Sequence, residues 1–507
     1  MSDQKTNKPI RVAFIHPDLG IGGAERLIVD AALGLQEKGY EVKMFTSHCD
    51  KNHCFEEVKD GTLEVEVFGD DLPTNYQKRF FIVFATLRQL FLIWKLYSTD
   101  QLNNYDLYIV DQLSTCLPFL HLFSNAKLFF YCHFPDKFLS YRSSLLKKLY
   151  RIPFDLTEQF ALSCADKIVV NSKFTGSMYR KAFNLLRDEP DVIYPCVDLE
   201  PIKIDDVDQI LFDQLFNDGD KYYLSINRYE GKKNVKLALR AFALSKAASD
   251  DKLKLVICGG YDPRVIENVE NLLELEKEAK ALKLPYSTIS YTDYSQDHDL
   301  VNIDTKDKKV IFLTSISTSL KELLLSKTEM LMYTPTNEHF GIVPLEAMKY
   351  GKPVLATNTG GPLETVVSYI PNKNEDETTG WSRAPIPGSW ANVIDNIMTL
   401  PDIDFKSNGE KRIKTHFTRD VMTWAFEENI DKILWKKKTK LFWENILFSL
   451  LRLMLHVLIV KIYPTASMPF LFLAAVSFLY FKDFMGTVYW SFIFVLTSDM
   501  LANYLSK

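Results

Sequence analysis

Residues 11–38 read RVAFIHPDLGIGGAERLIVDAALGLQEK and hold the pattern on which the fold assignment depends. Arg11–Ile15 is a short apolar run, as expected of a buried parallel strand. His16–Gly23 interrupts the run with one proline and three glycines. Ala24–Lys38 then has helical periodicity and stops at Gly39, a residue that suits a helix C-terminus. The segment therefore predicts a strand, a glycine-rich loop and a helix.

The same alternation of apolar runs and helical segments continues on both sides of one polar stretch. Residues 194–220 are rich in Asp, contain two prolines and have no strong periodicity, so we interpret them as a linker. Alternating strands and helices of this length imply parallel, doubly wound sheets. Further strands are predicted before the linker at Tyr40–Thr46, Tyr105–Asp111, Leu128–His133 and Lys167–Asn171, and after it at Lys221–Asn227, Leu253–Cys258, Lys309–Leu313, Glu329–Tyr333 and Pro353–Thr357.

The predicted fold class is α/β, with two Rossmann-like domains, a cleft between them and a C-terminal hydrophobic helical tail. A length of 507 residues agrees with two or three domains. We expect one Rossmann-like domain at residues 1–205, a second at 206–415, a closing amphipathic helix at 416–435 and a membrane-associated tail at 436–507. Ligands of such sheets bind at the C-terminal ends of the strands, so the loops there are the candidate site.

Composition and charge exclude several classes of protein. The chain is 47% hydrophobic and 25% charged, which excludes a disordered or fibrous protein. A formal net charge of −5 argues against a general nucleic-acid binder, because phosphate contacts need a basic face. The seven cysteines form no CxxC pair and several lie in apolar runs. We therefore expect reduced, buried thiols in a protein that faces the cytosol.

Two segments have the composition of membrane-seeking chain. Lysines at 436, 437, 438 and 440 precede the dense apolar stretch 441–505, within which Ile462–Phe481 is uncharged for 20 residues. A hairpin dipping into the bilayer, two short tilted spans and a buried helical bundle all remain open for this tail. The apolar segment Arg79–Trp94 fits a helix docked on a membrane and a core helix equally well.

Glu338–Glu346, with the sequence EHFGIVPLE, carries the clearest chemical pattern. It follows a predicted strand, and Pro344 and Gly351 suit the start and end of a helix with Glu346 in its first turn. A helix N-terminus attracts phosphate, and the carboxylates on either side of it could bind hydroxyl groups. That arrangement fits a nucleotide sugar. The alternative is that Glu346 only complements the helix dipole and Glu338 is solvated.

A second pattern, NRYEGKKN at 227–234, places two cations on one loop. Arg228 and Lys233 lie across a glycine turn and could stabilise a leaving diphosphate, although a basic surface loop is an equal alternative. Gly259, after the next strand, allows a close approach of the backbone to a ligand. His133 ends a strand at the rim of the cleft, where a lone histidine is more often structural.

The first glycine loop excludes two common nucleotide sites. Gly20–Gly23 is not the GxGxxG of dinucleotide oxidoreductases, and it lacks the lysine of a P-loop. Asp18, Glu25 and Arg26 in the same region are candidates for acceptor contact, with solvated loop charges as the alternative. No spacing typical of a metal site stands out, so we expect no bound metal. We also expect no cofactor, because a nucleotide sugar would be a substrate.

These positions together carry a resemblance to a known family. The spacing Glu338-x7-Glu346, with Arg228, Lys233 and the Gly22-Gly23 loop, resembles the signature of glycosyltransferase family 4 on a GT-B fold. The likeness covers residues 10–435. Two further segments, HPDLGIGGAER at 16–26 and CHFPD at 132–136, are similar to those of fungal mannosyltransferases of the dolichol pathway of asparagine-linked glycosylation.

The resemblance implies an activity and a set of roles. The enzyme would move mannose from GDP-mannose to Man-GlcNAc-GlcNAc-PP-dolichol with retention, forming the α-1,3 and α-1,6 branches. Arg228 and Lys233 would hold the diphosphate, Glu338 the mannose hydroxyls and Glu346 the ribose. The remaining implied positions are Gly22, Gly23, Gly259, His339, Phe340 and Gly341 for the nucleotide sugar, and His133 beside the transferred sugar.

The resemblance also implies a setting, and other functions stay open beside it. Expected partners are the dolichol-linked acceptor, the membrane and other mannosyltransferases of the pathway, with no nucleic acid. The expected location is the endoplasmic reticulum membrane, with the catalytic domains on the cytosolic face. The alternatives are another family 4 enzyme of the same pathway, a nucleotide-sugar epimerase and a membrane-tethered scaffold with an inactive site.

Overall fold

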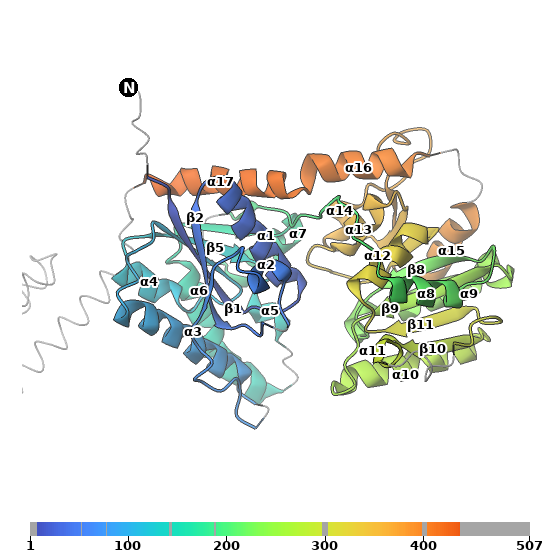
Figure 1. Cartoon of the computed structure of the whole chain (residues 1–507), viewed down its shortest axis with the longest axis horizontal. Coiled ribbons are helices and arrows are strands. Elements are labelled where there is room, and N and C mark those ends of the chain that lie inside the picture. The colour runs from blue at the N-terminus through green and yellow to red at the C-terminus, as the bar shows by residue number, and fades with distance from the viewer. Residues whose placement is uncertain are drawn as a thin grey trace, which may run out of the picture. The chain divides into compact units, whose positions relative to one another are not determined.

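The computed structural model describes residues 8–436, apart from 52, 78, 141–143, 187–188, 297–302 and 398–402. Within this range the chain forms two parallel sheets of seven strands each, with helices between successive strands (Figure 1). The predicted pair of Rossmann-like domains is therefore confirmed. The apolar tail predicted to follow residue 436 lies outside the described residues.

The first sheet has the strand order β3-β2-β1-β4-β5-β6-β7. Its central strand β1 pairs in parallel with β2 and β4, so the carboxyl ends of the neighbouring strands share one edge. The strands are β1 (Arg11–Asp18), β2 (Glu41–His48), β3 (Val65–Val67), β4 (Leu107–Asp111), β5 (Lys127–Cys132), β6 (Lys167–Val170) and β7 (Asp191–Val192). The helices are α1 (Gly23–Glu37), α2 (Glu56–Lys59), α3 (Phe81–Ser98), α4 (Leu117–Phe123), α5 (Asp136–Leu139), α6 (Leu145–Leu162) and α7 (Lys173–Ala182).

The second sheet has the order β10-β11-β9-β8-β12-β13-β14. Its strands are β8 (Lys221–Ile226), β9 (Leu253–Gly259), β10 (Tyr286–Ser290), β11 (Val310–Thr314), β12 (Met330–Tyr333), β13 (Val354–Thr357) and β14 (Gly380–Arg383). The helices are α8 (Asp206–Leu215), α9 (Lys236–Leu244), α10 (Ile266–Ala281), α11 (Tyr291–Gln296), α12 (Thr318–Lys327), α13 (Val343–Lys349), α14 (Pro362–Thr365) and α15 (Pro387–Asn396), with short 3₁₀ turns at Gly231–Lys233 and Lys246–Ser249.

Two consecutive helices return the chain from the second domain to the first. α16 (Phe405–His416) packs on α13, and α17 (Arg419–Leu434) packs on α1, as the orange ribbons of Figure 1 show. The Phe426 ring of α17 lies 5.6 Å from Phe129 and 5.8 Å from Tyr131, both on β5. A side chain at Gly34 of α1 would collide with Thr423 of α17. The helix predicted near 416–435 therefore belongs to the core of the first domain.

The linker predicted at residues 194–220 is only partly irregular. α8 occupies Asp206–Leu215 and buries Asp208, Leu211 and Leu215 in the second domain. The sequence did not reveal this helix, because its aspartates interrupt the apolar periodicity by which a helix is recognised. In the first helical turn, however, acidic residues favour a helix. The strands that the sequence did not reveal, β3, β7, β10 and β14, are the edge strands of the two sheets.

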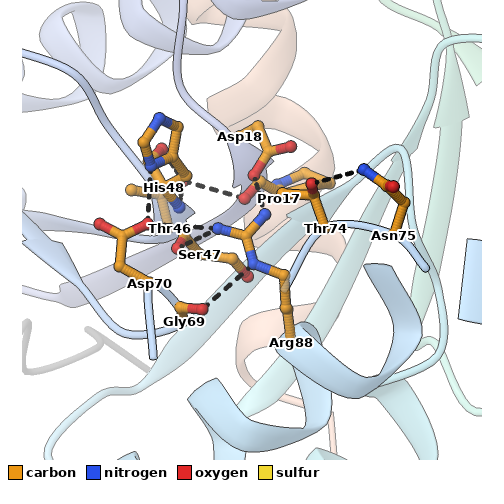
Figure 2. Close-up of polar contacts among 10 residues, drawn as sticks. All are labelled: Pro17, Asp18, Thr46, Ser47, His48, Gly69, Asp70, Thr74, Asn75 and Arg88. Atoms are coloured by element: carbon orange, nitrogen blue, oxygen red, sulfur yellow. Dashed lines mark hydrogen bonds and ion pairs between the residues drawn. The ribbon is translucent and has the colours of Figure 1, made fainter. Parts of the chain in front are cut away.

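The apolar segment at residues 79–94 forms α3, which is buried on one side only. Five of its 18 residues are buried, and one of them is Arg88. The Arg88 guanidinium donates to the carbonyl oxygens of Ser47 at 2.9 Å and Gly69 at 3.1 Å. It also donates to the carboxylates of Asp18 at 3.0 Å and Asp70 at 3.3 Å (Figure 2). Arg88 thus fastens α3 to the ends of β1 and β2 and to the loop that follows β3.

Candidate active site

A cavity of about 470 Å³ lies at the carboxyl ends of the strands and takes its lining from both domains. The first domain contributes the start of α1 and the end of β5, and the second contributes the loops after β8, β9 and β12. Nine of the predicted site residues line it: Gly23, His133, Arg228, Lys233, Gly259, Glu338, His339, Phe340 and Gly341. Two others, Gly22 and Glu346, are not among the lining residues.

Lys233 and Glu338 form an ion pair at the wall of this cavity. The Lys233 Nζ lies 2.6 Å from Glu338 Oε2, and the two side chains are 18% and 21% exposed. The Lys233 loop is joined to the end of β12, because the Thr334 hydroxyl donates to the Lys233 carbonyl at 2.7 Å. The pair is therefore preformed between the two loops that the sequence singled out.

Arg228 is a positively charged side chain that lies exposed at the cavity. Its side chain is 67% exposed, and its guanidinium lies 3.6 Å from the Glu230 carboxylate. Lys232 contacts the same carboxylate at 3.1 Å. An exposed guanidinium at a cavity that also holds Lys233 can turn toward an anion with little loss of existing contacts.

Glu346 lies in the first turn of α13, as predicted, but its charge is already matched. Its Oε1 accepts a hydrogen bond from Lys321 at 2.8 Å, and Lys321 also lies 3.6 Å from Glu322. Burial alone lowers the pKa of Lys321, but the attraction of Glu346 and Glu322 raises it above its usual value. Glu346 is therefore separate from the Lys233–Glu338 pair, beyond the lining of the cavity.

Two glycines are required by close backbone approaches at the site. Gly259 has a φ of +149°, and a Cβ there would meet the Asn227 carbonyl oxygen at 2.1 Å. Gly341 has a φ of +86°, and a Cβ there would lie 3.1 Å from the Tyr333 ring. Side chains at either position would push the cation loop or the Glu338 loop out of place. The sequence suggested Gly259 for a close approach to a ligand, and Gly341 came from the family resemblance; the contacts with Asn227 and Tyr333 were not foreseen.

Contacts between the domains border the cavity. The His339 ring stacks on Phe134, with centroids 3.8 Å apart, and the Ser172 hydroxyl donates to the His339 carbonyl at 2.5 Å. Glu364 accepts from the backbone amides of Lys173 at 2.8 Å and Phe174 at 2.9 Å, at the start of α7. Burial lowers the pKa of His339 to about 4, so the stacked ring is neutral at pH 7. The sequence did not indicate this set, because only the fold brings residues 134–174 near residues 339–364.

The three charged candidates of the first loop have other partners. Asp18 binds Arg88, and Arg26 donates to Asp30 and Glu57. Glu25 lies over Gly22, where a side chain would meet the Glu25 carboxylate, and none of the three candidates lines the cavity. The three side chains are therefore paired within the first domain, neither solvated loop charges nor part of the lining of the cavity. Among the described residues, no group of three or more His, Cys, Asp or Glu side chains could hold a metal ion.

Comparison of the fold and sequence with known proteins defines the class. The family model for glycosyltransferase family 4 matches residues 21–201, and that for group 1 glycosyl transferases matches residues 206–412. Sucrose-phosphate synthase from Thermosynechococcus elongatus superimposes with a TM-score of 0.62 at 19% identity, covering 83% of this chain and 98% of that one. HepE from Anabaena, bound to UDP and glucose, gives 0.59 at 17% identity, covering 83% and 100%. The chain is a glycosyltransferase with the GT-B fold.

Closer relatives narrow the class to one enzyme family. The α-1,3/1,6-mannosyltransferase ALG2 of Saccharomyces cerevisiae is 56% identical over 96% of this chain and 97% of its own length. The protein of that name from Kluyveromyces lactis is 52% identical over the same shares, and the one from Schizosaccharomyces pombe is 44% identical over 85% and 82%. The chain belongs to the α-1,3/1,6-mannosyltransferase family, which confirms the resemblance drawn from the motifs.

Proposed function

We propose that this mannosyltransferase moves mannose from GDP-mannose to Man-GlcNAc-GlcNAc-PP-dolichol, adding the α-1,3 and then the α-1,6 branch, or the reverse, in one cleft. The α-1,3/1,6 specificity printed in the names of its relatives supports the two linkages. The observation that carries the donor assignment is the Lys233–Glu338 pair at the wall of the cavity, with Arg228 exposed beside it.

The electrostatics of that pair suit a sugar diphosphate. A bound diphosphate competes with Glu338 for Lys233 and attracts Arg228, so both cations face the charge that develops as the glycosyl bond breaks. Glu338, released from Lys233, then accepts hydrogen bonds from hydroxyls of the mannose. The backbone amides of His339, Phe340 and Gly341 lie on the same loop and can bind the remaining oxygen atoms. Glu346 in α13 would bind the ribose by exchanging its contact with Lys321.

Retention in this site does not follow the route of a retaining glycosidase. That route needs two carboxylates about 5 Å apart across the scissile bond. Glu338 lines the cavity, whereas Glu346 is held by Lys321 outside that lining. We therefore propose front-face attack, in which the leaving phosphate helps to take the proton of the acceptor hydroxyl.

We also propose that catalysis needs no metal ion, because Arg228 and Lys233 line the cavity and can bind the diphosphate themselves. Partial or full activity should persist in excess EDTA. Complete loss that Mg²⁺ or Mn²⁺ restores would contradict the proposal. On this proposal, the site binds the nucleotide sugar without a metal ion.

Because the proposed acceptor is linked to a lipid, the enzyme must act at a membrane. We propose the cytosolic face of the endoplasmic reticulum membrane. Among the described residues, α3 alone is long and apolar enough to cross a membrane by length and composition. Exposed aromatic side chains at both ends of α3 meet those of the neighbouring helices: Phe80, just before α3, lies 6.2 Å from Tyr150, and Tyr97 lies 6.0 Å from Phe123. The cysteines of the described chain are all free, which agrees with a reducing compartment. Other mannosyltransferases of the pathway are the proposed protein partners.

The test is transfer by the pure protein. Labelled GDP-mannose and Man-GlcNAc-GlcNAc on a lipid diphosphate are incubated with the chain, and the released glycan is analysed for size and linkage. The proposal expects two added mannoses, one α-1,3 and one α-1,6. Interconverted nucleotide sugars without transfer would favour an epimerase, and an unchanged mixture would favour a binding scaffold.

A further inference from the structure

Three side chains in the first domain form a hydrogen-bonded row that ends at the cavity. Asp111, at the end of β4, is 1% exposed and lies between His16 of β1 and His133 just after β5. The row follows from the strand order β1-β4-β5, which places these strand ends side by side. His16 Nδ1 lies 2.9 Å from both oxygen atoms of Asp111, and His133 Nε2 lies 2.8 Å from Oδ2. Of the three, His133 lines the cavity.

The hydrogen-bond inventory fixes where the ring protons lie. An ionised carboxylate only accepts, so His16 Nδ1 and His133 Nε2 must both carry a proton and donate it to Asp111. The available ring nitrogen of His133 is then Nδ1, for which no hydrogen bond is found among the described residues. The His133 ring is also held by packing on Tyr131, with centroids 4.9 Å apart. Its orientation is therefore set from two sides.

His16 keeps the row electrically balanced. Its side chain is fully buried, and its Nε2 lies 3.9 Å from Glu25 Oε1. Burial by itself lowers the pKa of His16, but the attraction and hydrogen bond of Asp111, aided by Glu25, raise it to about 10. Burial on its own would raise the pKa of Asp111. The attraction and hydrogen bonds of His16 and His133 outweigh burial and lower the pKa of Asp111 below its usual value. Gly22 makes the Glu25 contact possible, since a side chain at Gly22 would occupy the place of that carboxylate.

We infer that Asp111 and His16 are positioning residues that hold His133 as the neutral tautomer protonated on Nε2. In that tautomer Nδ1 is a hydrogen-bond acceptor for a sugar hydroxyl in the cavity. His16 binds the same carboxylate from the other side and so fixes the orientation of Asp111 toward His133. The sugar as ligand rests on the proposed function; the tautomer does not.

Two substitutions of His133 separate the roles of its ring nitrogens. In His133→Asn the side-chain amide lies near the place of Nδ1, and in His133→Gln it reaches the place of Nε2. We expect His133→Gln to keep the bond to Asp111 and fold normally, but to lose kcat by about tenfold or more. His133→Asn should retain the larger part of the turnover. Wild-type turnover in His133→Gln would overturn the inference.

Asp111→Asn tests the positioning directly. We expect a fall in kcat of about tenfold with little change in KM for GDP-mannose. ¹⁵N spectra of the histidine-labelled protein should show that the fixed Nε2–H tautomer of His133 is lost. Asp166→Asn is the matched control, since Asp166 is a carboxylate of the same domain, 11% exposed, that binds Lys127 and the Leu128 amide. Unchanged kcat in Asp111→Asn, or an Nδ1–H tautomer in the wild type, would contradict the inference.

The spectra also separate this inference from the proposed function. A wild-type chain that shows the Nε2–H tautomer yet transfers no mannose would refute the function and leave the positioning row in place. His16→Gln is the second variant: kcat should fall, and the ¹⁵N spectra should show a weaker preference of His133 for the Nε2–H tautomer. An unchanged kcat and an unchanged tautomer in His16→Gln would show that His16 takes no part in positioning His133.

Discussion

At the scale of single residues, the candidate site combines an ion pair that is already formed with an exposed arginine. Lys233 and Glu338 lie 2.6 Å apart, and Arg228 is exposed beside them. The loop residues were predictable, because charged side chains and glycines at strand ends stand out against apolar strands. Asp111, Phe134 and Glu364 were not, since their partners are 22 or more residues away in the sequence. Only the strand order and the approach of the two domains bring those partners together.

The two glutamates of the motif should differ in their kinetic effect. Glu338→Gln removes a carboxylate that lines the cavity, and we expect kcat to fall by about 100-fold or more. Glu346→Gln alters the proposed contact with the ribose and should mainly raise KM for GDP-mannose. Steady-state kinetics at saturating donor checks this. A larger loss of kcat in Glu346→Gln would contradict the assignment of the two roles.

His339 should make stability depend on pH. Its folded pKa is about 4, below the value of about 6.5 in an unfolded chain, so the unfolded state binds more protons between these values. Stability from this residue is full above about pH 6.5 and is lost as the pH falls toward 4. His339→Phe keeps an aromatic ring on Phe134 and should lose less thermal stability between pH 7 and pH 5. An identical shift of the unfolding midpoint in both proteins would refute this.

At the scale of elements, α3 is the helix whose role the sequence left open. Its apolar pattern fits a membrane face and a core equally, and the structure shows one buried side and one exposed side. The sequence could not separate the membrane and core interpretations of α3, because one of its buried residues, Arg88, is charged. Arg88 interrupts the apolar run, yet its guanidinium binds two carbonyls and two carboxylates at the ends of β1 and β2 and in the loop after β3 (Figure 2).

Removing that guanidinium should destabilise the first domain. Arg88→Met leaves the carbonyls of Ser47 and Gly69 without their donor, and we expect a loss of about 2–4 kcal/mol in the free energy of unfolding. Arg180→Met is the control, because the Arg180–Glu189 pair is mostly exposed and should contribute less than about 1 kcal/mol. Chemical denaturation compares the two variants. Equal stabilities would mean that Arg88 does not anchor α3.

At the scale of the whole molecule, the sequence predicted two parallel sheets, because buried strands and helices alternate with clear glycine and proline boundaries. Every strand predicted from an apolar run is present within two residues of its expected ends or extends beyond them. The short edge strands and α8 were missed, since they lack the continuous apolar run of a central strand. The course of α17 back to the first domain also lies beyond sequence patterns, because its partner α1 is almost 400 residues earlier.

The tail should be needed for the membrane and not for the fold. Residues 1–436 form one compact unit that includes both sheets and α17. A chain ending at residue 440 should bind GDP-mannose as the full chain does and use a short water-soluble acceptor. It should fail on dolichol-length acceptor in bilayers, because anchoring raises the local concentration of that acceptor. Loss of folding or of donor binding on truncation would place the tail in the core.

The central claim is that one cleft expels GDP in both mannose additions, and Lys233→Ala tests it most directly. Lys236→Ala is the control, since Lys236 pairs with Glu274 and is not among the residues that line the cavity. The measurement is a time course of glycans with two and three mannoses, from acceptors that carry one mannose or two. We expect Lys233→Ala to slow both additions by about 100-fold or more, because both transfers develop charge on the same diphosphate. If only one of the two additions were lost, separate sites would have to exist and the account would be wrong.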